Sequence, residues 1–319
     1  MADVGTGVES TAGDPQPSPE TSDEFDVPMA VVDAHLHLWD LRRSAYEWIT
    51  PELGPLHTTF TAERAHAELR GAGVGRAVLV QAEDSEADTE FMLEVATANS
   101  WVAGVVGWLK LDDPAAAERQ LDRWSAEPTF VGVRHLVHDD PRDDFLALPA
   151  VRTSLRLLAA RGLPFDVPDA WPRHLAATAE LAAALPGLTV VLDHLGKPPH
   201  GQPEFAEWRS VLADVAAHPN TVAKVSGLQV RGMPFTADVL RPAWDAALEL
   251  FGPHRLIWGS DWPMTLLAAG YAGTWDVLSA LVGELTADEQ QKVLAGTACR
   301  VYRLGSVLTK QLTTPEAPC

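Results

Sequence analysis

Eight short apolar runs recur along the chain, and each predicts a β-strand. They are rich in valine, leucine or isoleucine, and turn residues or charged residues bound them. The runs lie at residues 30–36, 76–82, 102–108, 130–135, 164–167, 189–194, 221–226 and 255–261. Their nearly continuous apolar character is typical of strands that are covered on both faces, as in a parallel sheet.

Amphipathic stretches with helical periodicity separate these runs. They lie at 61–72, 85–99, 113–126, 147–161, 171–185, 204–217, 236–251 and 272–304, the last broken near 283–286. Thr61, Asp113 and the pair Thr286 with Glu289 are predicted to cap helix starts. Left-handed C-caps are expected at four glycines: Gly71, Gly162, Gly187 and Gly252.

Eight alternating strand and helix units in about 280 residues predict an α/β protein with the (β/α)8 TIM barrel fold. A doubly wound open sheet is the alternative, but such sheets usually carry a glycine-rich phosphate loop after the first strand. Here the first strand ends in histidines, so the pattern favours the barrel. Its active site is then expected at the carboxyl ends of the strands.

The two ends of the chain differ in composition from this central part. Residues 1–28 are rich in Gly, Ser, Thr, Pro and acidic residues and contain no Lys or Arg. Such a segment cannot bury enough apolar surface to offset its ordering entropy, so we expect a disordered acidic N-terminal tail. The barrel domain is predicted to cover residues 29–305, followed by a loose C-terminal tail at 306–319.

Composition and charge narrow the protein class further. The formal net charge of −20 argues against nucleic-acid binding through phosphates. No run of about 18 apolar residues predicts a membrane span, and the start does not resemble a secretory signal. The two cysteines, Cys299 and Cys319, give no disulfide framework, and together with the missing signal they indicate a cytoplasmic location. The expected partner is a small-molecule substrate. The oligomeric state, monomer or homo-oligomer, stays open.

The first strand, in the segment 31–40, ends in His35 and His37. Strand side chains alternate between faces, so the two imidazoles are expected to point the same way. A pair of this kind can bind one metal ion or polarise one carbonyl group. The alternative is two half-buried histidines that happen to lie near a turn.

Polar residues also close the other predicted strands. They are Gln81; Trp108 and Lys110; Arg134, His135 and His138; Asp166; Asp193 and His194; Ser226; and Asp261 with Trp262. A ring of His and Asp at a barrel mouth suits a divalent metal such as zinc. The same ring without metal could polarise a carbonyl through imidazole N–H groups. In both cases the cluster activates an electrophile that faces a carboxylate base.

Ordered motifs along residues 30–304 resemble the amidohydrolase superfamily. They are His-x-His at 35–37, Gly-Val-Arg-His at 132–135, Leu-Asp-His-Leu-Gly-Lys-Pro at 192–198, Ser-Gly-Leu at 226–228 and Gly-Ser-Asp-Trp-Pro at 259–263. More narrowly, they resemble the amidohydrolase-related branch of sugar lactonases, which includes fuconolactonases, rhamnonolactonases and the pyrone-dicarboxylate lactonase. The resemblance implies a hydrolase of carboxylic esters that acts in carbohydrate metabolism.

This resemblance also implies a central site formed by His35, His37, His194 and Asp261, which would be both the catalytic residues and the metal ligands. Many superfamily members use a carboxylated lysine on strand four to bridge two metals. Arg134 and His135 stand there instead, so we expect one divalent metal, with zinc the expected ion, or none.

The expected reaction is hydrolysis of a lactone, in which Asp261 accepts a proton from water and returns it to the leaving alkoxide. The histidines, or the zinc that they hold, would stabilise the oxyanion. One alternative is metal-dependent non-oxidative decarboxylation of an aromatic or unsaturated acid, which chelators should abolish. Another is a non-catalytic binding barrel, disfavoured because all four central residues are present.

Six further residues are candidates for substrate binding. The side chains of Arg134, His135 and Lys197 could bind a carboxylate or a hydroxyl group, or could form ion pairs at the rim. Three tryptophans could stack on a sugar ring or serve only in packing: Trp39, Trp108 and Trp262. Asp193 should face opposite to His194, into packing or into hydrogen bonds that support the site, and is left out of the chemistry.

Overall fold

The computed structural model describes residues 1–2 and 31–305, and almost all of both predicted tails lies outside the described residues. Eight parallel strands pair in sequence order, from β1 to β8. Their bounds are β1 Val32–Leu36, β2 Arg76–Val80, β3 Val102–Gly107, β4 Phe130–Arg134, β5 Phe165–Val167, β6 Val190–Leu192, β7 Thr221–Val225 and β8 Leu256–Trp258. Each lies within one of the eight predicted strands.

The sheet closes between β1 and the segment that follows β8. Two backbone hydrogen bonds form this seam, from Asp261 N to His35 O at 2.8 Å and from His37 N to Trp262 O at 2.8 Å. Together with the parallel pairing of all neighbouring strands, this closure makes the fold a (β/α)8 barrel, as the alternation of elements predicts.

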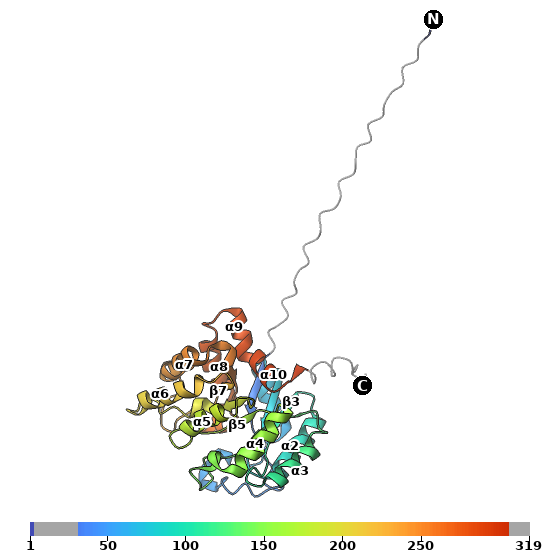
Figure 1. Cartoon of the computed structure of the whole chain (residues 1–319). Helices are drawn as coiled ribbons and strands as arrows, with labels where there is room; N and C mark the ends of the chain where they lie inside the picture. The colour runs from blue at the N-terminus through green and yellow to red at the C-terminus, as the bar shows by residue number, and fades with distance from the viewer. Residues whose placement is uncertain (3–30, 306–319) are drawn as a thin grey trace.

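Helices surround the strands in Figure 1. The α-helices are α1 Ala62–Gly71, α2 Glu86–Ala98, α3 Pro114–Trp124, α4 Pro149–Arg161, α5 Leu175–Ala184, α6 Phe205–Ala216, α7 Ala237–Phe251, α8 Gly270–Val282, α9 Ala287–Gln291 and α10 Thr297–Val301. Short 3-10 segments are η1 Pro51–Leu56, η2 Phe145–Ala147, η3 Asp193–Gly196, η4 Pro253–Arg255 and η5 Met264–Leu267, and the π-helical turn η6 spans Lys292–Gly296.

Several predicted helix starts are confirmed by their hydrogen bonds. The Thr61 and Asp113 side chains accept from the backbone of the first turn, and Thr286 forms a capping box with Glu289. The glycine prediction holds only in part. Gly162 is a left-handed C-cap, whereas Gly71 is the last residue of α1, Gly187 lies beyond the end of α5, and Gly252 has φ 67° but an extended ψ of 164°.

A second apolar cluster fills the barrel interior on the side away from the carboxyl ends of the strands. It joins small inward-facing residues of the strands, such as Val78, Val191 and Val222, to residues at the C-terminal end of the domain, such as Val301 and Tyr302. Helix α10 and the residues that follow it therefore pack against the inward-facing strand residues of the barrel. Among the described helices, none is long and apolar enough to cross a bilayer.

Candidate active site

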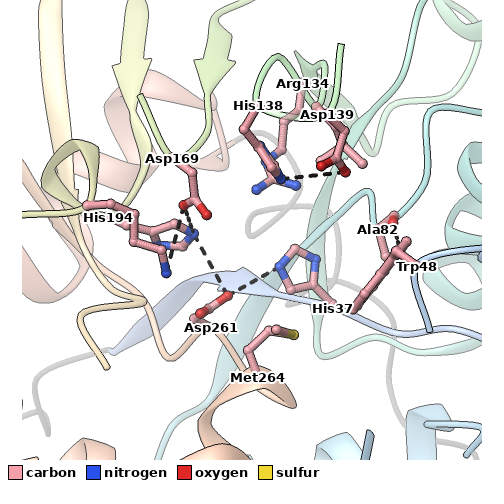
Figure 2. A pocket seen from close by; sticks show the side chains of 12 residues that line it. His37, Trp48, Ala82, Arg134, His138, Asp139, Asp169, His194, Asp261 and Met264 are labelled. Atoms are coloured by element: carbon pink, nitrogen blue, oxygen red, sulfur yellow. Dashed lines mark hydrogen bonds and ion pairs between the residues drawn. The ribbon is translucent and has the colours of Figure 1, made fainter. Parts of the chain in front are cut away.

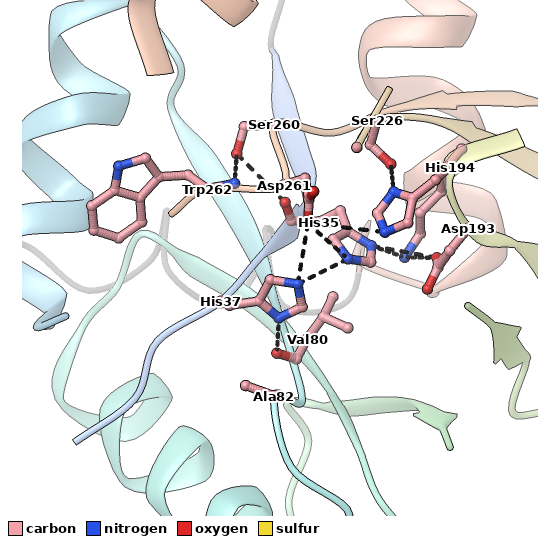
Figure 3. A network of polar contacts seen from close by, with 12 residues as sticks. His35, His37, Val80, Ala82, Asp193, His194, Ser226, Ser260, Asp261 and Trp262 are labelled. Atoms are coloured by element: carbon pink, nitrogen blue, oxygen red, sulfur yellow. Dashed lines mark hydrogen bonds and ion pairs between the residues drawn. The ribbon is translucent and has the colours of Figure 1, made fainter. Parts of the chain in front are cut away.

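Three histidines and one aspartate lie close together at the carboxyl ends of the strands β1, β6 and β8. His35 ends β1, His37 follows it, His194 lies in η3 directly after β6, and Asp261 follows β8. The Oδ1 atom of Asp261 lies 3.4 Å from His37 Nε2, 3.8 Å from His35 Nε2 and 3.9 Å from His194 Nε2. Figure 3 shows these rings turned toward the Asp261 carboxylate. The structure thus brings together all four predicted central residues.

The His35 and His37 rings approach each other at their Nε2 atoms, which are 3.1 Å apart. On the far side of His37, Nδ1 lies 2.8 Å from the carbonyl oxygen of Val80 at the end of β2. On the far side of His35, Nδ1 lies 3.1 Å from Lys224 Nζ, on β7. Each ring is therefore held by a contact from another strand, β2 for His37 and β7 for His35, and both project to the same side, as the strand alternation predicts.

His194 is fixed by the Ser-Gly-Leu segment that follows β7. Its Nδ1 atom lies 3.0 Å from Ser226 Oγ, and the ring packs directly over Gly227. A Cβ atom at position 227 would lie only 2.2 Å from His194 Nδ1, so the close approach requires glycine. His194 itself has φ 57°, a left-handed conformation that costs energy for a residue with a side chain and that often marks functional sites.

Asp261 also adopts a left-handed conformation, with φ 62°. Its second carboxylate oxygen, Oδ2, accepts a hydrogen bond of 2.8 Å from Gln229 Nε2. This contact and the backbone bond across the seam leave Oδ1 facing the three imidazoles. The chain turns out of β8 before Asp261, and this turn aims the carboxylate at the histidines.

The charges of the site follow from burial and from these contacts. Burial lowers the pKa of His35 well below its usual range and lowers that of His194 to about 4. Burial alone would raise the pKa of Asp261, but His194, His37 and Lys197 together hold it well below its usual range. At neutral pH the site therefore combines the neutral imidazoles of His35 and His194 with an ionised Asp261 carboxylate.

A fully buried ionic cluster lies beneath the histidines. Lys224 Nζ is 2.7 Å from Asp166 Oδ2 and 3.1 Å from Asp193 Oδ1, and all three side chains are inaccessible to solvent. Arg134 Nε donates to Asp193 Oδ2 at 2.9 Å, and the Tyr302 hydroxyl donates to Asp166 Oδ2 at 2.7 Å. Although burial opposes ionisation of Asp193, Lys224 and His35 hold its pKa well below the usual range.

The donor atoms of the central residues fit a single zinc ion. Tetrahedral zinc with nitrogen and oxygen ligands at about 2.0–2.2 Å places neighbouring donors roughly 3.3 to 3.6 Å apart. His35, His37 and Asp261 offer three buried donor atoms within 4.8 Å of one another, with individual separations of 3.1 to 3.8 Å. His194 Nε2 lies 3.9 Å from Asp261 Oδ1, but His194 belongs to a second group of possible ligands, with His35 and Asp193.

His37, His194 and Asp261 line a pocket with a volume of about 230 Å³, whereas the buried His35 does not line it. Figure 2 shows the pocket with His37, His194 and Asp261 on one side and Arg134, His138 and Asp139 on the other. Two buried polar atoms in its lining, Asp169 Oδ1 and His138 Nδ1, have no hydrogen-bond partner among the described residues. A ligand with several hydroxyl groups could satisfy them.

The six residues predicted to bind substrate divide into two groups. Arg134 and Lys197 line the pocket, although Arg134 is bound to Asp193 and Lys197 Nζ donates to Gly227 O at 2.8 Å. The other four do not line this pocket. Trp39 and Trp262 pack in the core on either side of a phenylalanine, and the Trp108 indole donates to His135, which stacks on another phenylalanine. Stacking of these tryptophans on a sugar ring in this pocket is not supported.

Sequence reasoning missed several residues of the site. They are Lys224, Asp169 and Gln229. Asp193 contacts His35 and Arg134 behind the site, which agrees with the second of its two expected roles. A signal existed for Lys224, because a lysine inside a buried strand is rare unless it is paired. Asp169 and Gln229 lie in loops, where no periodic pattern indicates a direction.

This barrel, with its histidines and aspartate at the carboxyl ends of the strands, is an enzyme scaffold of the amidohydrolase type. The amidohydrolase family model (Amidohydro_2) matches residues 32–304, and the chain belongs to this family. It is 35% identical over 282 residues to an L-fucono-1,5-lactonase of Burkholderia ambifaria, an alignment that covers 86% of this chain and 95% of the relative.

Two further relatives extend this comparison. A 2-pyrone-4,6-dicarboxylate hydrolase of Comamonas testosteroni is 26% identical, with 88% of this chain and 92% of the relative aligned. A crystal structure of an amidohydrolase from Burkholderia multivorans with bound zinc superimposes with a TM-score of 0.78 at 31% identity, covering 86% of this chain and 99% of that one.

Proposed function

We propose that this chain is a lactonase that opens a neutral, hydroxyl-bearing sugar lactone by hydrolysis of its ester bond. The observation that carries the proposal is the carboxylate of Asp261, which faces three imidazoles and lines a pocket together with two of them, His37 and His194. A polarising group opposite a carboxylate is what attack of water on an ester carbonyl requires. The L-fucono-1,5-lactonase from Burkholderia ambifaria supports this substrate class.

In the proposed reaction, Asp261 orients a water molecule and accepts one of its protons as the water oxygen bonds to the lactone carbonyl carbon. The carbonyl oxygen becomes an oxyanion. When the tetrahedral intermediate collapses, the bond from carbon to the ring oxygen breaks, and Asp261 returns the proton to the departing alkoxide. The product is an open-chain hydroxy acid, and Asp261 is ionised again.

The histidines stabilise the oxyanion in this proposal. A neutral imidazole can direct an N–H group at the carbonyl oxygen, and Lys197 adds positive charge at the pocket rim. When zinc is bound by His35, His37, His194 and Asp261, it supplies Lewis-acid polarisation of the carbonyl and a lower pKa for water. The zinc-bound structure of the Burkholderia multivorans relative supports zinc as the metal.

The charges around the pocket favour a neutral lactone over a dicarboxylate. Arg134 is bound to the buried Asp193, and Lys197 lies 3.8 Å from Asp169, so neither cation is free of an acidic neighbour. Asp139 and Asp169 add negative charge to the lining. Hydroxyl groups can donate to such acceptors, whereas a second substrate carboxylate would meet repulsion.

A panel of lactones tests the proposal. Purified protein is assayed with L-fucono-1,5-lactone, other aldonolactones and 2-pyrone-4,6-dicarboxylate, with a pH indicator to detect released acid. We expect the aldonolactones to be the better substrates by at least about tenfold in kcat/KM, which corresponds to 1.4 kcal/mol. Faster turnover of the dicarboxylate, or release of carbon dioxide from aromatic acids that a chelator abolishes, would replace this function with another.

The variant Asp261→Asn provides the matched mechanistic test, because it keeps the size of the side chain and removes its capacity to accept the proton. We expect kcat to fall by about 100-fold or more, while KM changes little. Gln229 should keep the asparagine in place through the side-chain oxygen. Full activity of Asp261→Asn would exclude the proposed role.

A further inference from the structure

Lys224 is a buried lysine that the proposed chemistry does not use. It projects from β7 into the barrel directly beneath His35, and its side chain is inaccessible to solvent. An ammonium group has three N–H donors and no acceptor. Three acceptors surround it, namely Asp166 Oδ2 at 2.7 Å, Asp193 Oδ1 at 3.1 Å and His35 Nδ1 at 3.1 Å.

The contact between Lys224 and His35 fixes the direction of one hydrogen bond. Because the ammonium can only donate, Nδ1 of His35 must accept, and the hydrogen of the neutral ring then lies on Nε2. Asp193 Oδ1 lies 3.3 Å from the same Nδ1 atom and could accept a hydrogen from it. Asp193 Oδ1 lies close to both Lys224 Nζ and His35 Nδ1 but meets hydrogen-bond geometry with neither, whereas the contact between Lys224 and His35 does satisfy it.

His37 leads to the same assignment from the opposite side. Its Nδ1 atom lies 2.8 Å from the carbonyl oxygen of Val80, which can only accept, so Nδ1 carries a hydrogen. In the neutral ring Nε2 of His37 is then a bare acceptor. The Nε2 atoms of His35 and His37 are 3.1 Å apart, a contact that requires one donor and one acceptor. A hydrogen on His35 Nε2 supplies the donor.

We propose that Lys224 is a positioning residue that holds the hydrogen of His35 on Nε2, toward His37, and thereby weakens zinc binding by the histidine pair. A nitrogen that ligates zinc carries no hydrogen, and the other ring nitrogen of the ligand usually donates to a carboxylate or carbonyl. Zinc binding at Nε2 therefore moves the hydrogen to Nδ1, where it faces the N–H groups of Lys224.

The lysine thus sets a balance between two uses of one imidazole. With the hydrogen on Nε2, His35 donates to His37 Nε2 and orients that ring, which lines the pocket; the use of this ring on a substrate rests on the proposed lactonase function. With the hydrogen on Nδ1 and directed to Asp193, His35 is a metal ligand supported by a carboxylate. Lys224 favours the first state, and Asp193 favours the second.

A charge-matched double variant tests the effect on zinc. Lys224→Met combined with Asp166→Asn removes the ammonium and one carboxylate, so the net charge near His35 stays the same. We expect zinc to bind about 10- to 100-fold more tightly, measured by competition with a fluorescent chelator. Structural damage would weaken binding, so a gain is specific to the proposal, and unchanged or weaker binding would overturn it.

A second variant separates this effect from simple electrostatics. Lys197→Met also removes a positive charge near the site but has no contact with His35. We expect it to leave the hydrogen of His35 on Nε2, whereas the double variant should move it to Nδ1. Nitrogen-15 NMR of the imidazole distinguishes the two forms, and loss of the signal in His35→Gln assigns it.

The wild-type spectrum decides the case even if the double variant does not fold. A hydrogen on His35 Nε2 in the zinc-free wild-type protein supports the proposal, and a hydrogen on Nδ1 refutes it. Neither reading involves lactone turnover. A failure of the proposed lactonase function would therefore appear in the substrate panel alone, with the spectrum unaffected.

Discussion

The position of the His194 imidazole depends on the absence of a side chain at residue 227. Gly227 has φ 57°, and a Cβ atom there would overlap the His194 ring at Nδ1, Cε1 and Cγ. The ring cannot retreat easily, because Ser226 holds it from the same segment and its own backbone is in the left-handed region. One glycine therefore helps to set the distance between His194 and Asp261.

Gly227→Ala should displace the His194 ring and lower kcat/KM for the best lactone by more than about tenfold, since small misplacements of reacting groups are costly. Steady-state kinetics measures the effect. Gly187→Ala is the matched control, because nothing lies within 4 Å of the added methyl group and the backbone there does not have a positive φ. Equal activity in the two variants would contradict this account of His194.

The sequence predicts which side chains meet at this site better than it predicts what supports them. His35, His37, His194 and Asp261 follow apolar runs, so the barrel rule alone places them at one rim. The residues that support these four side chains are harder to predict from the sequence. Lys224 lies inside a strand, Asp193 precedes a histidine whose φ is positive, and Gln229 acts from a loop. Their contacts depend on backbone turns that carry no periodic pattern.

At the level of elements, the predicted strands exceed the observed ones most where the chain leaves the sheet to form the site. The predicted strands 189–194 and 255–261 end in the structure at Leu192 and Trp258. The apolar pattern continues into the turns that follow, so it cannot report where pairing stops. The helix predicted at 171–185 begins only at Leu175, because residues 171–174 form a turn.

The helix α8 is joined to the first strand through a buried carboxylate. Tyr271 on α8 donates from its hydroxyl to Asp33 Oδ2 at 3.1 Å, and Asp33 Oδ1 accepts from the backbone N–H groups of Ser260 and His35. Burial raises the pKa of Asp33 to about 6. One aspartate thus links β1, the segment after β8 and a helix of the outer ring.

Tyr271→Phe should lower the free energy of unfolding by about 1–3 kcal/mol, because it leaves a buried acceptor with one donor fewer. Urea denaturation monitored by tryptophan fluorescence measures the loss. Combined with Asp33→Asn in a double-mutant cycle, the two changes should not be additive. Additive losses would show that the hydroxyl and the carboxylate do not interact energetically.

For the whole molecule, buried neutral histidines make stability depend on pH. Burial lowers the pKa of His135 to about 4, against an ordinary value of 6.5 in the unfolded chain. The folded state therefore holds His135 neutral, and the unfolded state binds the proton more readily as the pH falls. The contribution of this residue is complete above pH 6.5 and is lost progressively as the pH falls toward 4.

Between pH 7 and pH 5 the wild-type protein should lose about 2 kcal/mol more of its unfolding free energy than the variant His135→Gln. Urea unfolding at the two pH values gives the difference for each protein. His57→Gln, at an exposed histidine, is the control and should keep the wild-type difference. A loss in His135→Gln as large as in the wild type would assign the pH dependence to other groups.

The seam between β1 and the segment after β8 also has a consequence for how activity arises during folding. Asp33 and Ser260, which meet across it, are separated by 227 positions in the chain, and His35 and Asp261 lie beside them. Contacts of such high sequence separation form late, because a long loop must close first. Recovery of lactone turnover during refolding should therefore lag behind recovery of the helical circular-dichroism signal. Enzyme activity would then report on the rate at which the barrel closes at this seam.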